Sequence, residues 1–206
     1  MGKVRAVCIS EKRGTQKKNI ESAVFVENWG IEGDAHAGNW HRQISLLSEE
    51  TIAAFKARGA EVTDGAFGEN LVVSGYDFTK FPIGTRFTCK DVVLELTQIG
   101  KECHHGCEIF QKMGECIMPT NGVFAKVLHG GKISVGDEFH VQYRAAVITL
   151  SDTASKGERE DASGAAAEEI VGKEGYEVVF KKIIPDDGDT LTALLCELSD
   201  EDKADL

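Results

Sequence analysis

The sequence lacks a long apolar run and shows no secretion signal. No stretch of its 206 residues approaches the ~18 consecutive apolar residues of a membrane helix. Near the start, Lys3 and Arg5 interrupt the apolar residues where a signal peptide needs a continuous core. The six cysteines are therefore expected to be thiols kept reduced in the cytoplasm, available for chemistry or for a metal. These absences predict a cytoplasmic protein with no membrane partner.

Basic charge is also in short supply. Lys and Arg number 23 against 34 Asp and Glu, which gives a formal net charge of −11. An acidic chain repels the phosphate backbone, and this argues against nucleic acid as a broad-surface partner. Basic side chains nevertheless concentrate in residues 1–18, where a small anionic ligand could still bind.

Prolines are few as well: three, against 22 glycines. Many glycine turns between short apolar runs are typical of β-rich architectures. A helix is predicted over residues 49–58, after Ser48 as N-cap, and residues 123–128 could form a strand or a helical turn. The predicted strands cover residues 4–10, 23–26, 43–47, 70–73, 85–89, 92–98, 114–118, 132–133 and 138–142. Residues 1–142 are thus expected to form a mainly β, barrel-like domain with a few short helices.

The pattern changes near Tyr143. Residues 145–150 form an apolar run typical of a strand buried on both faces. A polar turn over residues 151–163 follows. A helix (164–174), a strand (176–184) and a further helix (190–198) then predict a parallel-sheet α/β module over residues 143–206. Residues 204–206 fall where the next strand is expected to begin, so we expect an incomplete module. Its exposed sheet edge could support a homodimer.

The segment richest in potentially reactive or metal-binding side chains contains Cys103, His104, His105 and Cys107, with Cys116 nine residues later. Thiols and imidazoles so close together suit a soft metal such as zinc, or a molybdenum centre. The paired C-x-x-C spacing of zinc ribbons is missing. Cys103, Cys107 and Cys116 are therefore candidate metal ligands.

Alternatively, one of these cysteines acts as a sulfur carrier. That chemistry requires a thiolate, which nearby cations such as Lys101 favour. Cys8, Cys89 and Cys196 are isolated within strand or helix patterns, and we interpret them as small core hydrophobes.

A glycine- and histidine-bearing loop carries the candidate ligand-binding residues Gly33, Asp34, His36 and Arg42. Backbone N–H groups and a guanidinium could cradle an oxyanion or phosphate there. Spacing alone favours a turn-rich connection whose glycines serve backbone geometry. Asn70, in a second Gly-Glu-Asn turn, is equally ambiguous.

Several segments over residues 1–142 occur in an order that carries a resemblance. They read GIEGDAH (30–36), RQISLL (42–47), FGENL (67–71), IG (83–84), GEC (114–116), GVFAKV (122–127) and GD (136–137). Together they resemble the MOSC family, the domain at the C-terminus of molybdenum-cofactor sulfurases, a family associated with pyridoxal phosphate. The resemblance implies a barrel-like fold and a cysteine that carries sulfur or binds molybdenum, best matched by Cys116. Cys103 and Cys107 are additional to it.

Residues 143–206 resemble the molybdopterin adenylyltransferase family through TLSDTASKG (149–157), DASG (161–164) and IPDD (184–187). The resemblance implies a pterin or nucleotide site near Ser151, Asp152, Asp161, Ser163 and Gly164. It also implies that Asp186 handles magnesium, a hard cation that neutralises phosphate charge.

The Thr-Thr-Gly-Gly-Thr-Gly phosphate loop of that family would follow the next strand and is not present in residues 143–206. Its backbone donors are the main phosphate anchor, so this segment taken alone is expected to be inactive as an adenylyltransferase.

The leading hypothesis is a role in molybdenum-cofactor metabolism. Cys116 would carry a persulfide for sulfur transfer, or would be a permanent molybdenum ligand in a small oxidoreductase. One alternative is a non-catalytic carrier that hands cofactor between biosynthetic and target enzymes, helped by the tethered second module. Another is a zinc-stabilised structural domain.

Overall fold

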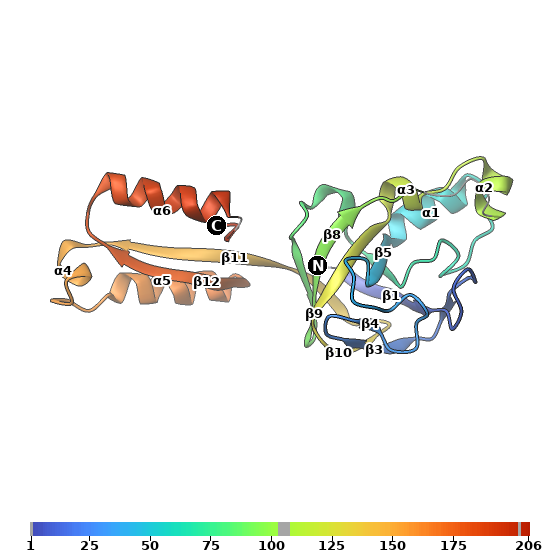
Figure 1. Cartoon of the computed structure of the whole chain (residues 1–206), viewed down its shortest axis with the longest axis horizontal. Helices are drawn as coiled ribbons and strands as arrows, with labels where there is room; N and C mark the ends of the chain where they lie inside the picture. The colour runs from blue at the N-terminus through green and yellow to red at the C-terminus, as the bar shows by residue number, and fades with distance from the viewer. Residues whose placement is uncertain (1, 103–107, 202) are drawn as a thin grey trace. The chain divides into compact units, whose positions relative to one another are not determined.

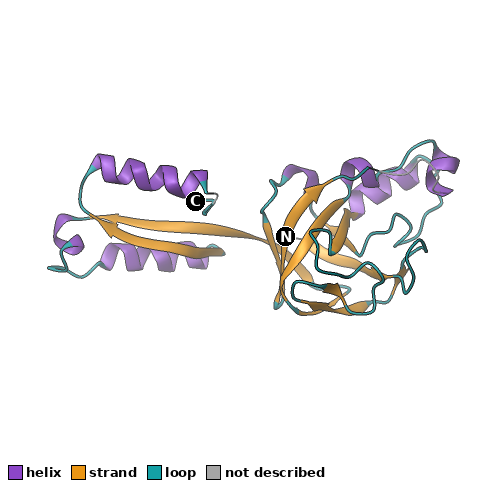
Figure 2. Ribbon diagram, viewed as in Figure 1, coloured by secondary structure: helices purple, strands orange, loops and turns teal. Residues whose placement is uncertain are grey.

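The computed structural model describes residues 2–102, 108–201 and 203–206. The chain divides into two compact units, residues 1–141 and 142–206, and strand β11 (Glu138–Leu150) contributes to both. The fold is mostly sheet with a few helices, as Figure 2 shows. No helix of the described residues is long and apolar enough to cross a membrane.

The first unit is organised around a large mixed sheet (Figure 1). Its strands are β1 (Gly2–Ile9), β2 (Lys18–Asn19), β5 (Ile44–Ser48), β6 (Leu71–Ser74), β7 (Arg86–Cys89), β8 (Val92–Ile99), β9 (Val123–His129) and the start of β11. They follow the order β11-β7-β8-β9-β5-β6-β1-β2, and β11 also pairs with β1. Strands β5 and β6 run parallel, whereas the other pairs with a recorded register within this unit are antiparallel. A smaller sheet joins β10 (Gly131–Ser134), β3 (Ser22–Val26) and β4 (Gly30–Ile31).

Alternation of apolar residues builds the core on one face of this sheet. Val92, Leu94 and Leu96 of β8 are fully buried, and the intervening residues are only partly buried. An aromatic cluster closes the core at one end, where the rings of Phe87 and Phe139 stack at 5.5 Å between centroids. The 3₁₀ helix η1 (Phe78–Lys80) contributes to this cluster.

A second core lies against helix α1 (Glu49–Ala57). The predicted N-cap is present, because the Ser48 hydroxyl accepts the backbone N–H of Thr51 at 3.3 Å. Ile52 and Phe55 of the helix pack with Phe67, and the two phenylalanine rings meet edge to face at 5.6 Å. This core supports the loop that precedes β6.

The prediction of a strand over residues 114–118 is wrong. The chain there leaves helix α2 (Glu108–Met113) through Gly114, which has a φ of +74°, and enters helix α3 (Met118–Asn121). Pro119 lies in the first turn of α3, where its missing N–H costs nothing. The apolar residues of this segment pack as side chains of a loop and a helix rather than pairing as a strand. Residues 123–128, predicted as either strand or helical turn, belong to strand β9.

In the second unit, β11 runs parallel to β12 (Tyr176–Ile184), and the unit also contains α4 (Asp152–Ser155), α5 (Ala162–Lys173) and α6 (Gly188–Asp200). Figure 1 shows α6 on one side of the strand pair and α5 on the other. Phe180 packs in the cluster containing Leu194 of α6, whereas the next residue, Lys181, pairs with Glu168 of α5 at 2.7 Å. The parallel α/β pattern is therefore present in reduced form.

Two expectations for this unit need correction. The run 145–150 is not buried on both faces: Ala145 and Val147 are buried, but Leu150 is 39% exposed. A sheet with so few strands leaves the strand ends uncovered. The polar turn over 151–163 also contains helix α4. A further strand is predicted to begin at residues 204–206. There the backbone carbonyl of Leu206 accepts the N–H of Ala146 at 2.7 Å, and the backbone N–H of Leu206 donates to the carbonyl of Arg144 at 3.1 Å.

Glu69 shapes the loop before β6 and sets a pH dependence for stability. Its fully buried carboxylate accepts the N–H groups of Gly65 at 2.6 Å and Phe67 at 3.0 Å. Burial raises the pKa of Glu69 from 4.5 to about 7, against the effect of these hydrogen bonds. Between about pH 4.5 and pH 7, Glu69 is thus protonated in the folded protein and ionised in the unfolded chain. The free energy of unfolding is expected to fall as pH rises from about 4.5 to about 7, by up to about 3 kcal/mol.

Urea unfolding at pH 5 and pH 7.5 measures this fall. Glu69→Gln removes the titrating group, so its fall between the two pH values is expected to be smaller than that of the wild type. Glu32→Gln, at an exposed glutamate, serves as the matched control. An identical pH dependence in wild type and Glu69→Gln would rule out the proton on Glu69.

Candidate functional site

A buried ion pair fixes the glycine- and histidine-bearing loop. The Asp34 carboxylate is completely buried and accepts Lys17 Nζ at 2.7 Å, the N–H of Ser10 at 3.0 Å and Asn70 Nδ2 at 3.0 Å. Burial alone would raise the pKa of Asp34, but these hydrogen bonds, led by that of Lys17, hold it below its usual value. Asp34 is therefore an ionised anchor at neutral pH, held behind the surface that a ligand could reach.

All the hydrogen-bonding groups of the Asn70 side chain are used within the protein, around the same anchor. Its amide also donates to the carbonyl of Cys8 at 3.0 Å, and its oxygen accepts from the N–H of Ser45 at 3.1 Å and from its hydroxyl at 3.0 Å. Two donors and two lone pairs are all that an amide offers. Asn70 thus joins β1, β5 and the loop. Gly33, with a φ of +79°, supplies the turn into Asp34.

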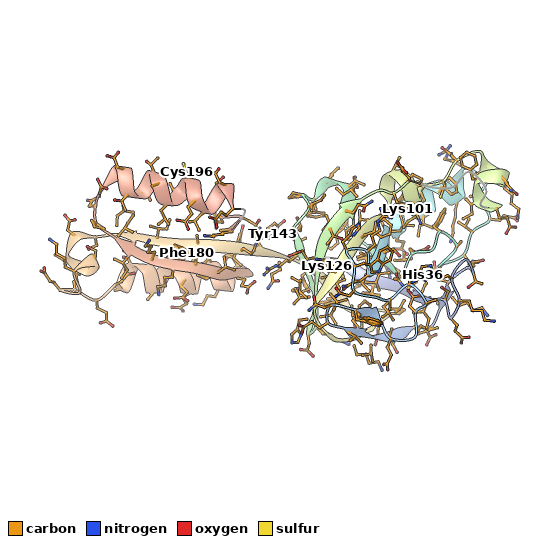
Figure 3. All side chains as sticks on the ribbon, viewed as in Figure 1. His36, Lys101, Lys126, Tyr143, Phe180 and Cys196 are labelled. Atoms are coloured by element: carbon orange, nitrogen blue, oxygen red, sulfur yellow. The ribbon has the colours of Figure 1, made fainter. Side chains whose placement is uncertain are left out.

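A cavity of about 910 Å³ opens in the first unit beside this anchor. Its volume lies in the range of ligand pockets, roughly 300–1,000 Å³. Of the sequence-predicted residues, it brings together His36, Arg42, Asn70 and Cys116. Figure 3 labels His36 and Lys101, both of which line it. Lys17, Trp40, Lys112 and Phe124 also line it.

The wall of the cavity carries an excess of cations. Arg42 lies 5.3 Å from the centre of the Phe124 ring, and Lys101 Nζ lies 6.0 Å from the same centre. Gln98 accepts from Arg42 Nε at 2.8 Å and orients the guanidinium. Two other lining cations are paired, Lys17 with Asp34 and Lys112 with Glu108 at 2.8 Å. The part of the wall that attracts anions is therefore formed by Arg42 and Lys101, even though the chain as a whole is acidic.

Cys116 lines the cavity from the segment between α2 and α3. It is half-buried and packs against the core that includes Ile117. The neighbouring Glu115 pairs with Arg58 at the end of α1, which ties the cysteine-bearing segment to that helix. Cys103 and Cys107, predicted as further metal ligands, lie outside the described residues. Among residues 2–102, 108–201 and 203–206, no group of three His, Cys, Asp or Glu could hold a metal ion.

The remaining cysteines divide into two kinds. Burial raises the pKa of Cys8 to about 12 and that of Cys89 to about 11, so both are inert thiols in the core, as predicted. Cys196 is exposed on α6, and its interpretation as a core residue is wrong. On this amphipathic helix, Leu194 and Leu198 take the buried positions.

His36 lines the cavity with its imidazole. Nδ1 lies 3.8 Å from Asp34 Oδ1, beyond hydrogen-bond distance, and is buried with no hydrogen-bond partner among the described residues. Burial, and then the nearby Lys17 charge, lower the pKa of His36. The imidazole is therefore neutral at pH 7 and able to donate from one nitrogen and accept at the other.

The second unit gathers its predicted site residues in two places. Asp161 caps α5, accepting the N–H of Gly164 at 2.8 Å, the Ser163 hydroxyl at 3.0 Å and the Thr149 hydroxyl at 2.9 Å. The Gly164 N–H is the main reason that the pKa of Asp161 lies below its usual value. A Cβ on Gly164 would lie 2.1 Å from Asp161 Oδ2, so this close approach requires glycine.

Ser151, Asp152 and Asp186 form the other group. Ser151 and Asp152 follow the end of β11, and Asp186 follows the end of β12. Because the strands are parallel, these ends share one edge, where open α/β sheets bind ligands. Asp152 Oδ1 accepts the N–H of Asp186 at 3.2 Å and links the two loops.

Some lining residues were missed as site residues from the sequence. Lys17 and Lys112 belong to local clusters of charge that resemble any solvated surface, and Trp40 follows a glycine-rich loop without a periodic pattern. The basic character of residues 1–18 was a usable signal for an anion site. The burial of Lys17 could not be predicted, because it depends on Asp34, 17 residues away, whose carboxylate is also held by Asn70, 36 residues further along the chain.

Comparisons with known proteins agree with the two-part organisation. The family model described as MOSC domain matches residues 33–140, and that described as probable molybdopterin binding domain matches residues 146–206. No curated protein gives a significant match.

Two solved structures share the fold at low identity. The YuaD protein from Bacillus subtilis has a TM-score of 0.59 at 22% identity, covering 68% of this chain and 96% of its own. YiiM from Geobacillus stearothermophilus has a TM-score of 0.53 at 16% identity, covering 86% of this chain and 94% of its own.

The buried pair makes a direct prediction for stability. Lys17→Met leaves the Asp34 carboxylate buried without a cation and is expected to cost about 3–5 kcal/mol of unfolding free energy. The double variant Lys17→Met/Asp34→Asn is expected to recover part of that loss, because no unpaired charge remains. Chemical denaturation measures both. Glu49→Gln, which breaks the exposed pair with Arg5, is the control and is expected to cost under about 1 kcal/mol. A loss as small as the control's for Lys17→Met contradicts the anchor role.

Proposed function

The chain belongs to the MOSC domain family, and on that premise we propose that its cavity binds molybdenum cofactor and that Cys116 is the reactive group. The matches to a MOSC domain and to a probable molybdopterin binding domain point to a function related to molybdenum cofactor. The observation that carries the proposal is the presence of Cys116 on the wall of a cation-rich cavity of about 910 Å³.

The residues present fit this cofactor. It is an anion through its phosphate, and its molybdenum accepts soft sulfur ligands. The cavity offers a thiol together with Arg42 and Lys101. Guanidinium and ammonium groups are the usual partners of phosphate. When bound, the cofactor would supply a redox-active metal that can carry a terminal sulfur or oxygen.

The chain's own residues would bind and orient. Arg42, aimed by Gln98 and stacked with Phe124, would hold the phosphate together with Lys101. His36 would present a neutral imidazole to the pterin part. Asp34 and Asn70 fix the loop that carries His36 and Arg42 through their hydrogen bonds, and Gly33 supplies the turn into Asp34.

Cys116 has two roles compatible with this site. As a permanent ligand, its thiolate would bind molybdenum directly. As a sulfur carrier, its thiolate would attack the outer sulfur of a donor persulfide, and the donor thiolate would leave. An acceptor nucleophile would then attack the outer sulfur on Cys116, with the Cys116 thiolate as the leaving group.

A non-catalytic carrier is the second candidate function. What favours it is the match of residues 146–206 to a probable molybdopterin binding domain on the same chain. Tethering two binding modules on one chain raises the effective concentration at one module of a ligand released by the other. Such a chain would pass cofactor between biosynthetic and target enzymes.

For the second unit we propose a pterin-binding role. The support is its match to a probable molybdopterin binding domain and the set of Ser151, Asp152 and Asp186 at the shared strand edge. Asp186 would bind magnesium there. We place the domain boundary between residues 142 and 143. The pairing of β11 with both β7 and β1 supports a barrel-like closure of the first domain.

Elemental analysis tests the leading proposal. Protein purified from a cofactor-producing host is expected to contain close to one molybdenum per chain. Cys116→Ala is expected to lose it if the thiolate is a ligand, whereas Cys196→Ala, which removes an exposed thiol on α6, is expected to keep it.

The other outcomes separate the alternatives. Molybdenum retained in Cys116→Ala, with persulfide detected on Cys116 of the wild type by mass spectrometry, would favour the sulfur carrier. Molybdenum retained with no persulfide would favour the non-catalytic carrier. Zinc in both proteins and no molybdenum would overturn cofactor binding and leave a structural domain.

A further inference from the structure

Trp40 is an exposed aromatic residue at the cavity. Trp40 lines the cavity and is 42% exposed. Its indole Nε1–H donates to the carbonyl of His36 at 3.1 Å, so the polar end of the ring is satisfied within the protein. What remains open is aromatic surface.

The turn that carries Trp40 is held firmly. The N–H of Ala37 donates to Asp34 at 3.0 Å, that of Gly38 to Trp29 at 2.8 Å, and that of Trp40 to Gly38 at 3.0 Å. The anchored Asp34 lies at one end of the turn. The ring is therefore fixed before any ligand arrives, and this lowers the entropic cost of stacking against it.

Hydrogen-bonding and charged groups accompany the ring. The neutral imidazole of His36, whose backbone carbonyl accepts the indole N–H, lines the same cavity with a side chain that is 36% exposed. Arg42, two residues after Trp40, brings the cation to Phe124. One short segment thus presents an aromatic face, a hydrogen-bonding group and a positive charge.

We infer that Trp40 and His36 form a stacking subsite for a planar heteroaromatic ring whose anionic group binds the cations at Arg42 and Lys101. The inference rests on the proposed function, since it concerns the same cavity, and it names the ligand class. The ring stacks on Trp40, its polar edge faces His36, and a phosphate or carboxylate meets the cationic wall. A pterin or a purine monophosphate has this chemistry.

Calorimetric titration of the metal-free chain compares adenosine monophosphate with ribose 5-phosphate, which carries the same phosphate without a ring. The nucleotide is expected to bind about 10-fold more tightly, a typical effect of stacking one base on an aromatic side chain. Trp40→Ala is expected to abolish this preference. Trp40→Phe, which keeps a ring but loses the indole N–H, is expected to retain part of it.

Equal binding of the two phosphates by the wild type would overturn the subsite, as would an unchanged preference in Trp40→Ala. No detectable binding of either would also overturn it. Because Trp40→Phe removes the hydrogen bond to His36 but keeps the ring, it separates stacking from a role in holding the turn.

The two tryptophans of the chain supply a matched control. Trp29 is 50% exposed and does not line the cavity. In Trp29→Phe, where Trp40 is the only tryptophan, the nucleotide is expected to quench the fluorescence at saturation. In Trp40→Phe, where Trp29 remains, no quenching is expected. Quenching of Trp29 instead would place the ring elsewhere.

Competition between pterin-6-carboxylate and adenosine monophosphate identifies the source of the ring. Tighter pterin binding assigns the subsite to the cofactor, and tighter purine binding assigns it to a separate substrate. These assays contain no molybdenum, so their failure removes the stacking subsite alone. The molybdenum content of Cys116→Ala tests the proposed function separately.

Discussion

The site depends on one buried ion pair. Lys17 and Asp34 meet at 2.7 Å with almost no solvent contact, and Asn70 bonds to the same carboxylate. A charge in such a position is tolerated only when its partner and its hydrogen bonds are all in place. The pair is therefore satisfied only when β1, β5 and the loop before Arg42 come together in one arrangement. This arrangement forms part of the cavity wall.

Much of the first unit follows from local patterns in the sequence. Alternating apolar residues over 92–98 predict β8 because a strand turns successive side chains to opposite faces. Ser48 predicts the start of α1 because a hydroxyl can accept an orphan N–H. Cys116, Arg42 and His36 were found through motif order, and the cavity brings all three to its wall. That they bind cofactor stays a proposal.

The rest depends on contacts between distant residues. The segment 114–118 has the apolar content of a strand, but Gly114 and Pro119 bend it into a loop and a short helix. Lys17 reads as a surface lysine until its partner is known. In the second unit, the run 145–150 has the composition of a doubly buried strand, yet burial also requires neighbouring strands, and composition cannot supply them. Cys196 was misplaced because it lies two residues, about half a helical turn, from both Leu194 and Leu198, and therefore points away from the buried face of α6.

Phe124 has a consequence beyond packing. Arg42 Cζ lies 5.3 Å and Lys101 Nζ 6.0 Å from its ring centre, so one aromatic ring attracts two cations through its negative faces. An anion bound by both cations would neutralise their charge. Occupancy and folding are therefore thermodynamically linked: a ligand that satisfies both cations adds its binding free energy to the stability of the first unit and makes the filled protein harder to melt.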